Sequence, residues 1–442
     1  MIAALAMLAL GLLGVLPACA IAGARAEAVA LAPLVGAGIV AVGAWIEVLI
    51  GGDLRLLSVG VGAVVWVVSA VRVRAVLHDT VVDARSLLFM IGPLAALAWT
   101  LQSLHRYELK WDARSIWLFH ARMLYGGHNT FITVAHATPF SHPDYPLLVS
   151  APVAATWQAT ARIDYRTGQL LIAALTACAV ILVGLCVARA AKCPTIVAVV
   201  VSVALCAALY GAFGAYATNG YVDPLCASLA AAALGYGLLV EPQRWSQSLS
   251  LVLIVLTAAA KNEGLAYAGI GLVALLVLRF RLERGDRLWL GAYGLAAVSL
   301  VAWPAIVRVH GIGSDLTRRL PGPVEHPGYR FSQLVGPEIA RYGTFPAAVL
   351  AVLVVIVVKR TRRDGVILYL AALIGSAVAL NLVYVVGPNE INYWIATSLD
   401  RTTQTIQALC LLVITVAGVL AATQLARARP ARREDHPTST SV

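Results

Sequence analysis

The sequence predicts an all-α, polytopic membrane protein with about 13 transmembrane helices, and three observations lead to that class. Hydrophobic residues make up 60% of the 442 positions and charged residues only 12%, whereas about a quarter of the residues in a soluble protein are charged. The mean hydropathy is +0.83. Apolar runs also recur near the roughly 20 residues that a helix needs to cross about 30 Å of hydrocarbon. Together these observations exclude a soluble globular protein.

The candidate spans are spread over almost the whole chain. They lie at about 1–22, 28–50, 56–71, 86–104, 169–190, 195–213, 225–240, 247–260, 264–280, 288–306, 345–358, 366–386 and 403–424. The first run contains small residues around Cys19 that resemble a signal-peptidase site, but no basic segment precedes the run. We therefore expect this run to remain in the protein as its first span.

Basic residues predict the orientation of the spans, because Lys and Arg in short loops stay in the cytoplasm. They cluster at alternate ends of the runs, near 72–85, 189–192, 244, 279–287, 359–363 and 427–433. The N-terminus is thus predicted to be outside and the C-terminus cytoplasmic, and the segments at 105–168, about 307–343 and about 387–402 are predicted to be extracytoplasmic loops. The net charge of +11 follows these boundaries without forming a continuous patch, which argues against nucleic-acid binding.

This pattern divides the chain into three parts. Residues 1–85 are predicted to be an N-terminal transmembrane extension, and residues 86–426 a larger transmembrane module. Residues 427–442 are basic and then rich in Pro, Ser and Thr, which is typical of a disordered tail. All seven cysteines lie in apolar runs or at their ends, so we interpret them as small buried residues rather than disulfide partners.

The longest polar interruption, residues 105–168, is dense in residues that carry chemistry. Its segment WDARSIWLFHARMLYGG, at 111–127, has apolar residues at helical spacing, which predicts an interfacial helix on the outer membrane surface. Asp112 would then lie near the lipid headgroups, with Glu108 one turn earlier and Trp111 beside it. The alternative is that Asp112 only pairs with a neighbouring basic residue at a wet interface.

The second segment of interest in this loop is HPDYPLL, at 142–148. Two prolines stiffen the chain around Asp144, which is flanked by His142 and Tyr145, and stiffened loops of this kind usually position functional groups. The loop also contains five histidines, but no pair has a ligand spacing with helical support. We therefore predict no cofactor, with a divalent metal as the alternative.

Three further polar clusters lie at run ends that are predicted to face outward. They are Asp223 in GYVDP, the run Lys261, Asn262 and Glu263 in KNEG, and Arg401 in SLDR. A charged triplet such as that in KNEG costs several kcal/mol when it faces lipid, so it must face a cavity or a partner. The alternative for each cluster is a simple solvated turn.

In this order, WDARSIWLFHARMLYGG, HPDYPLL, GYVDP, KNEG and SLDR resemble the bacterial members of the GT-C superfamily of membrane glycosyltransferases, close to the protein-mannosyltransferase and aminoarabinose-transferase type. The resemblance covers roughly residues 86–426. It implies transfer of a sugar from a polyprenyl-phosphate carrier to an acceptor on the outer face of the membrane, with Asp112 as the catalytic base. This chain inserts Asp144 and Tyr145 into a motif that reads His-Pro-Pro-Leu in many relatives, and Ala113 stands where several relatives carry a second acid. Asp144 and Glu108 are therefore alternative bases.

The chemistry of such a transfer suits these residues. A polyprenyl phosphate is already a good leaving group, so the enzyme needs a carboxylate to accept the acceptor's proton and cations to stabilise the developing phosphate charge. Asp112 suits the first role, and Lys261 and Arg401 suit the second. Displacement with a single base predicts inversion at the anomeric carbon. The residues assigned to substrate binding are Glu108, Trp111, His142, Asp144, Tyr145, Asp223, Lys261, Asn262, Glu263 and Arg401.

The expected partners are a polyprenyl-phosphate sugar donor, a glycan, lipid or protein acceptor, and membrane lipids, in a multi-pass protein of the cell membrane. A transporter or lipid flippase is the alternative function. That alternative predicts polar residues near the middle of the spans, whereas the acids here gather at one face. A purely structural membrane subunit would instead tolerate neutralisation of the outward acids.

Overall fold

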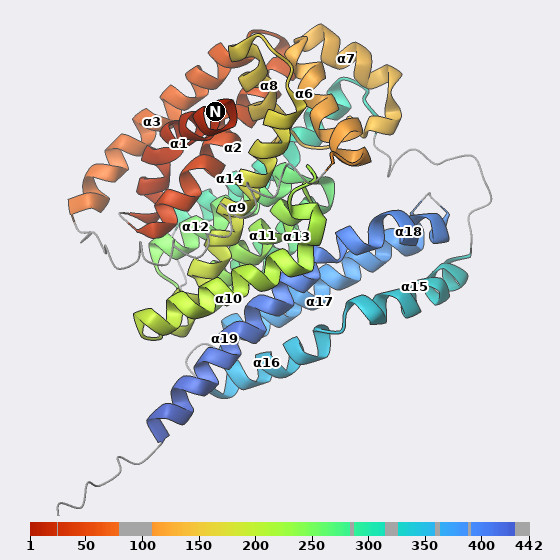
Figure 1. The fold of residues 1–442 in the computed structure, drawn as a ribbon. Coiled ribbons are helices and arrows are strands. Elements are labelled where there is room, and N and C mark those ends of the chain that lie inside the picture. Colours follow the sequence, from red (N-terminus) through yellow and green to blue (C-terminus); the bar gives the residue numbers. More distant parts are fainter. Residues whose placement is uncertain are drawn as a thin grey trace, which may run out of the picture.

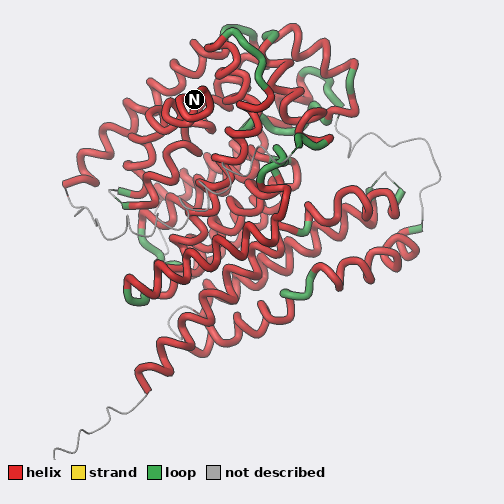
Figure 2. The backbone as a smooth tube through the Cα atoms, in the orientation of Figure 1, coloured by secondary structure: helices red, strands yellow, loops and turns green. Residues whose placement is uncertain are grey.

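The computed structural model describes residues 1–23, 25–78, 108–282, 287–313, 326–358, 363–387 and 390–428. Over these ranges the chain forms helices joined by turns, without a strand (Figure 2). The predicted all-α class is therefore confirmed for this part of the chain. Helices are the expected result for such an apolar sequence, because a helix satisfies its own backbone hydrogen bonds where lipid cannot.

Figure 1 shows the arrangement of the main apolar helices. Their bounds are α1 (Ile2–Ala22), α2 (Ala26–Ile50), α3 (Leu54–His78), α9 (Tyr165–Ala191), α10 (Thr195–Phe213), α11 (Asp223–Leu234), α12 (Arg244–Ala260), α13 (Asn262–Leu282), α14 (Arg287–Val309), α16 (Phe345–Val358), α17 (Arg363–Val386) and α19 (Gln404–Ala428). A π-helical turn, Gly235–Leu239, extends α11. Nearly every residue of the apolar window of α9 is buried, so this helix lies in the protein's interior and not at its lipid surface.

Among the described residues, nine helices are long and apolar enough to cross a membrane. The expected run at 345–358 forms one half of a pair bent by 62°. The runs at 225–240 and 247–260 form the shorter apolar helical stretches Asp223–Leu239 and Arg244–Ala260, which are not among these nine. The expected span at 86–104, the boundary at 85 and the tail beyond 428 lie outside the described residues. The protein is therefore a multi-pass membrane protein by helix length and composition, and the count of thirteen stays a prediction.

Segments that we expected to be loops also contain helices. The first carries a π-helical turn (Ala113–Trp117), α6 (Leu118–Tyr125), α7 (His128–Ala137) and α8 (Ser150–Thr160), which gather at the top of Figure 1. The second contains α15 (Pro327–Arg341), and the third contains α18 (Ile391–Thr402), which runs almost directly into α19. Neither α15 nor α18 was expected as a helix, because both carry too many polar residues to stand out as apolar runs, and the extracytoplasmic placement of these segments stays a prediction.

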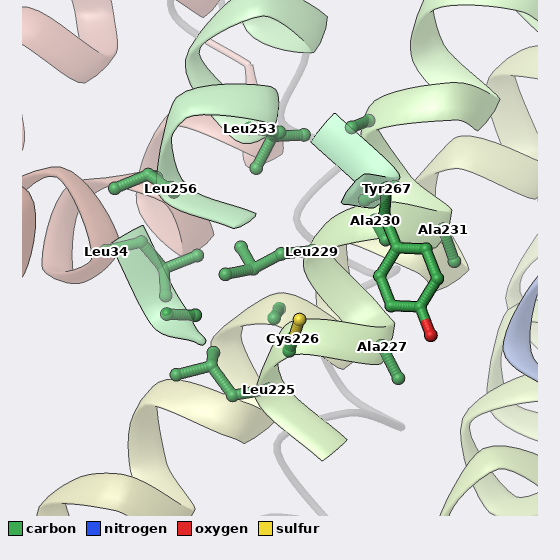
Figure 3. Close-up of a cluster of buried hydrophobic side chains, with 14 of the residues drawn as sticks. Leu34, Leu225, Cys226, Ala227, Leu229, Ala230, Ala231, Leu253, Leu256 and Tyr267 are labelled. Atoms are coloured by element: carbon green, nitrogen blue, oxygen red, sulfur yellow. The ribbon is translucent and has the colours of Figure 1, made fainter. Parts of the chain in front are cut away.

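The N-terminal helices pack into the same core as the rest of the molecule. Figure 3 shows Leu34 of α2 beside Leu225 and Leu229 of α11 and Leu253 and Leu256 of α12. All five side chains are buried. Helix α2 also contacts α7, α8, α9 and α14. The first helices are therefore in contact with the module that we expected them merely to precede.

Charged residues that we expected in the cytoplasm contact one another. Glu27, in the first turn of α2, accepts hydrogen bonds from Arg189 near the end of α9, with Nε to Oε1 at 2.7 Å and Nη2 to Oε2 at 3.0 Å. Arg281 of α13 pairs with Asp364 of α17 at 3.4 Å. Each of these contacts involves a basic cluster used to predict orientation. The side of the membrane on which they lie stays a prediction.

Candidate active site

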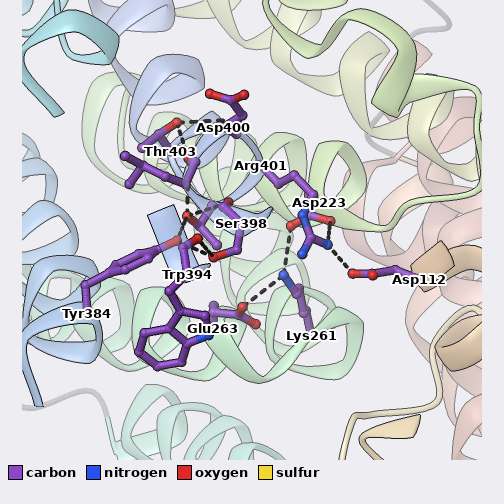
Figure 4. A network of polar contacts seen from close by, with 12 residues as sticks. Asp112, Asp223, Lys261, Glu263, Tyr384, Trp394, Ser398, Asp400, Arg401 and Thr403 are labelled. Atoms are coloured by element: carbon purple, nitrogen blue, oxygen red, sulfur yellow. Dashed lines mark hydrogen bonds and ion pairs between the residues drawn. The ribbon is translucent and has the colours of Figure 1, made fainter. Parts of the chain in front are cut away.

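Five charged side chains meet where α11 and α13 begin and α12 ends (Figure 4). They are Asp112 before the π-helical turn, Asp223 at the start of α11, Lys261 between α12 and α13, Glu263 in the first turn of α13, and Arg401 in α18. The sequence placed all five on one face of the membrane as separate motifs. The structure brings them together into one cluster, which we call the charged cluster.

Lys261 lies at the centre of the charged cluster and is only 5% exposed. Its Nζ contacts Asp223 Oδ1 at 2.7 Å and Glu263 Oε1 at 2.9 Å. The backbone of Lys261 is extended, which ends α12 and turns the chain directly into α13. A buried charge needs such partners, because removing one of them typically destabilises a protein by about 3–5 kcal/mol.

Arg401 connects Asp112, which precedes the π-helical turn, to the rest of the charged cluster. Its Nη1 donates to Asp112 Oδ2 and lies 3.9 Å from Asp223 Oδ2. Its guanidinium stands 4.9 Å from the ring centroid of Tyr221, a cation–π contact. Tyr221 was missed by sequence reasoning, although an aromatic residue next to the acid of GYVDP was a usable signal. One alternative was that Asp112 pairs with a basic residue next to it in the sequence. The structure instead pairs Asp112 with the distant Arg401.

Asp223 owes its position to the start of α11. Asp223 is the first residue of the helix and Pro224 is the second. Pro is favoured in the first turn because the N–H groups there have no acceptor within the helix. The N-terminal end of a helix carries partial positive charge and stabilises an acid. Asp223 therefore receives favourable interactions from the helix, Lys261 and Arg401 together.

Two glycines allow the motifs to approach one another. Gly220 has a φ of +88°, and a Cβ there would lie 2.7 Å from the Cβ of Ala113. A Cβ on Gly264 would lie 2.1 Å from the backbone oxygen of Thr257, so α12 and α13 could not pack so closely. Ala113 itself is fully buried. Position 113, where several GT-C relatives carry a second acid, is therefore a small buried side chain packed against Gly220.

The segment HPDYPLL lies over the start of α13. Asn262 Nδ2 donates to Asp144 Oδ2 at 2.8 Å, and Trp303 Nε1 donates to the backbone oxygen of Asp144 at 2.8 Å. The Leu148 N–H donates to the backbone oxygen of Ala259 in α12, at 3.1 Å. The predicted binding residues Asp144 and Asn262 are therefore in direct contact.

Tyr145 connects this segment to the charged cluster. Its ring stacks on His142, with centroids 5.0 Å apart, and lies 5.5 Å from the ring of Trp117. Burial raises the pKa of the Tyr145 hydroxyl well above its usual value, and the nearby Glu263 carboxylate raises it further, against the opposing effect of Lys261. Tyr145 therefore contributes a neutral hydroxyl close to the charged residues.

Two predicted residues lie apart from this arrangement. Trp111 is 71% exposed. Glu108 is also exposed, in an irregular stretch before the π-helical turn. The structure thus supports neither residue as part of the charged cluster, because the turn of helix expected between Glu108 and Asp112 does not form.

Histidines of the same loop have structural partners. His120 Nε2 bonds to the backbone oxygen of Ser141 at 2.7 Å, and His128 Nδ1 bonds to that of Glu47 at 3.0 Å. Within the described ranges, no three His, Cys, Asp or Glu side chains are placed to hold a metal ion. Whether the protein uses a cofactor stays open, and the expectation of none remains a prediction.

Comparisons with protein-family models, with curated proteins and with solved structures found no match to this chain. The GT-C resemblance therefore rests on its five motifs.

Proposed function

We propose that the protein is an integral-membrane glycosyltransferase that moves a sugar from a polyprenyl-phosphate donor to a cell-envelope acceptor, with inversion, on the extracytoplasmic face. The observation that carries this proposal is the contact between Asp112 and Arg401 beside Lys261. It places a carboxylate suited to proton transfer next to the cations suited to a phosphate. The ordered motifs that resemble the GT-C superfamily support the same reaction.

In this proposal the donor phosphate binds to Arg401 and Lys261. Arg401 Nε is buried and has no hydrogen-bond partner among the described residues, so it can donate to a phosphate oxygen. A phosphate competes with Asp112 for the guanidinium, because both are oxygen anions suited to the same planar donor group. Binding of the donor therefore frees the Asp112 carboxylate to act as a base.

The transfer step is then a single displacement. The acceptor oxygen attacks the anomeric carbon, the bond from that carbon to the phosphate oxygen breaks, and the phosphate keeps the electron pair. Asp112 takes the acceptor's proton, while Lys261 and Arg401 stabilise the charge of the departing polyprenyl phosphate. Attack on the face opposite the leaving group inverts the configuration.

A transporter or flippase for a lipid phosphate is the second candidate. The buried ion pairs around Lys261 favour it, since paired charges within apolar surroundings commonly mark a translocation path. The two functions differ in whether a covalent bond of the lipid breaks. They are therefore distinguishable with the same lipid and the same protein.

The test uses purified protein in vesicles of defined composition. Polyprenyl-phosphate pentoses and hexoses, each labelled in the sugar, are added together with envelope glycan as the acceptor. Glycosyl transfer predicts label in the acceptor and free polyprenyl phosphate. A flippase predicts intact lipid in the opposite leaflet with no change of its mass, and that result across all donors would contradict the proposal.

A further inference from the structure

We propose that Trp303 is a positioning residue that holds the Asp144 segment against the charged cluster, and that α2 supports it through Trp45. This inference gives the first helices a part in the site, and its role in catalysis rests on the proposed function. Trp303 lies within α14, in an apolar run that carries no motif. The sequence gives no sign that Trp303 contacts Asp144, and the contact is visible only in the structure.

The first step of the argument is the hydrogen bond itself. Trp303 is 2% exposed, and its indole N–H donates to the backbone oxygen of Asp144 at 2.8 Å. Asn262 contacts the side chain of the same residue. Asp144 is therefore held at its backbone from α14 and at its carboxylate from α13. Two attachments from different helices fix both the position and the direction of the carboxylate.

The second step is the packing of the Trp303 ring. It stacks on Trp45 of α2 with centroids 6.3 Å apart and an interplanar angle of 27°. Phe131 of α7 meets it edge-on, also at 6.3 Å. The Trp45 N–H is buried without a hydrogen-bond partner among the described residues, so Trp45 acts through its ring. Trp303 acts through both its ring and its N–H.

The third step is the anchoring of α2. At its outer end the backbone oxygen of Glu47 accepts a hydrogen bond from His128, at the start of α7. Further along, Leu34 packs against α11 and α12 in the core (Figure 3). Helix α2 is thus fixed in the core and attached to the loop helices. It provides a rigid support against which the Trp303 ring packs, and this packing keeps the indole N–H in contact with Asp144.

The consequence for catalysis follows from geometry. A displacement of about 1 Å at a reacting group can cost roughly a hundredfold in rate, even when the altered residue is far from the chemistry. Loss of the Trp303 hydrogen bond would loosen the segment 142–148 without removing a charged group. We therefore expect an effect on turnover and not on donor affinity.

The test compares three variants of the full-length protein in detergent or nanodiscs. Amide hydrogen exchange is measured over 142–148, where the Leu148 N–H reports on the contact with α12. Trp303→Phe should accelerate exchange by about 2- to 10-fold, the value of one net hydrogen bond. Trp45→Ala should also accelerate it, because the stacking ring is lost. Trp45→Phe should match the wild type, because a ring remains and no hydrogen bond is removed.

Trp66→Phe is the matched control. Trp66 of α3 also donates its indole N–H to a backbone oxygen, that of Leu13 at 2.7 Å, but far along the chain from the site. It should leave exchange over 142–148 unchanged. Unchanged exchange in Trp303→Phe would overturn the inference, and equal acceleration in Trp45→Phe and Trp45→Ala would overturn the role of the Trp45 ring.

An activity measurement completes the test. Trp303→Phe should lower kcat by about tenfold or more while the donor Kd and the amount of folded protein stay at wild-type values. A wild-type protein that transfers no sugar would refute the proposed function, yet the exchange results would still decide whether Trp303 holds the segment. Faster exchange with unchanged kcat would overturn its catalytic role.

Discussion

Two clusters of charge lie near opposite ends of the helical stretch Asp223–Leu239, and they differ in how completely their atoms are paired. Glu27 is satisfied: both oxygens accept from Arg189, and the Tyr236 hydroxyl lies 3.4 Å from Oε1. The charged cluster contains three acids and two cations. In it, Asp223 Oδ2, Glu263 Oε2 and Arg401 Nε lack hydrogen-bond partners among the described residues. Complete pairing is typical of a structural contact, whereas the unpaired atoms of the charged cluster are the groups that the proposed function assigns to the donor and acceptor.

The largest expected effect breaks the charged cluster at its proposed base. Asp112→Asn keeps the size of the side chain but removes its ability to accept a proton, and a positioned base contributes about 10²–10⁴ in rate. We expect a folded protein that binds donor and loses at least about a hundredfold in transfer, measured with labelled lipid.

Asp53→Asn is the control for Asp112→Asn, because Asp53 pairs with Arg55 at an exposed helix start outside the cluster. It should retain full activity. Asp144→Asn and Glu108→Gln should lose less than Asp112→Asn. Near-normal turnover of Asp112→Asn would move the base to Asp144.

The second prediction concerns the donor. Arg401→Gln removes a cation whose hydrogen bonds to a charged group are worth about 1.5–3 kcal/mol, so the Kd for polyprenyl-phosphate sugar should rise by roughly 10- to 100-fold. Binding is measured by fluorescence titration in detergent. Arg281→Gln, which breaks the exposed pair with Asp364, should leave the Kd unchanged. Equal affinity in both variants would place the phosphate elsewhere.

The third prediction tests the cluster formed by Glu27, Arg189 and Tyr236. Glu27→Gln removes the carboxylate that accepts two hydrogen bonds from Arg189, and because Arg189 is partly exposed we expect a loss of only about 1–3 kcal/mol in stability. Thermal unfolding in detergent should occur at a lower temperature. Transfer per folded molecule should be unchanged, and a selective loss of turnover would show that the two clusters are not separate in function.

The smallest expected effect is a pH dependence of stability. Burial lowers the pKa of His120 to about 4, although its bond to Ser141 works in the opposite direction. The unfolded chain has a pKa near 6.5 and so binds a proton first as the pH falls. The stability is therefore complete above about pH 6.5 and decreases as the pH falls toward 4. The unfolding temperature should decrease over this range, and less so in His120→Gln; parallel curves for the two proteins would contradict the assignment.

Much of the site could be predicted because charge is conspicuous in an apolar chain. Asp223, Lys261 and Arg401 each interrupt or border an apolar run, and the cost of charge in lipid argues that such residues face a polar interior. Which charges meet could not be predicted. Arg401 and Asp112 are 289 positions apart, and only the packing of the helices brings them into contact.

Other features carry no signal in a single sequence. Trp303 and Trp45 lie inside apolar runs, where an aromatic residue is indistinguishable from ordinary core packing. Helix α15 was missed because its polar residues lower its mean hydropathy. One of them, Arg330, is buried and donates a hydrogen bond to the backbone oxygen of Tyr384.

The shortness of α11 and α12 has a consequence for the depth of the site. The helical stretches Asp223–Leu239 and Arg244–Ala260 are at most 17 residues long. At about 1.5 Å per residue they measure roughly 26 Å, several ångströms less than a hydrocarbon layer of about 30 Å. When their far ends lie level with one surface, Asp223 and Lys261 are recessed below the other. The headgroup of a lipid would then reach these residues by moving a few ångströms below the membrane surface, while its hydrocarbon chain stays within the bilayer.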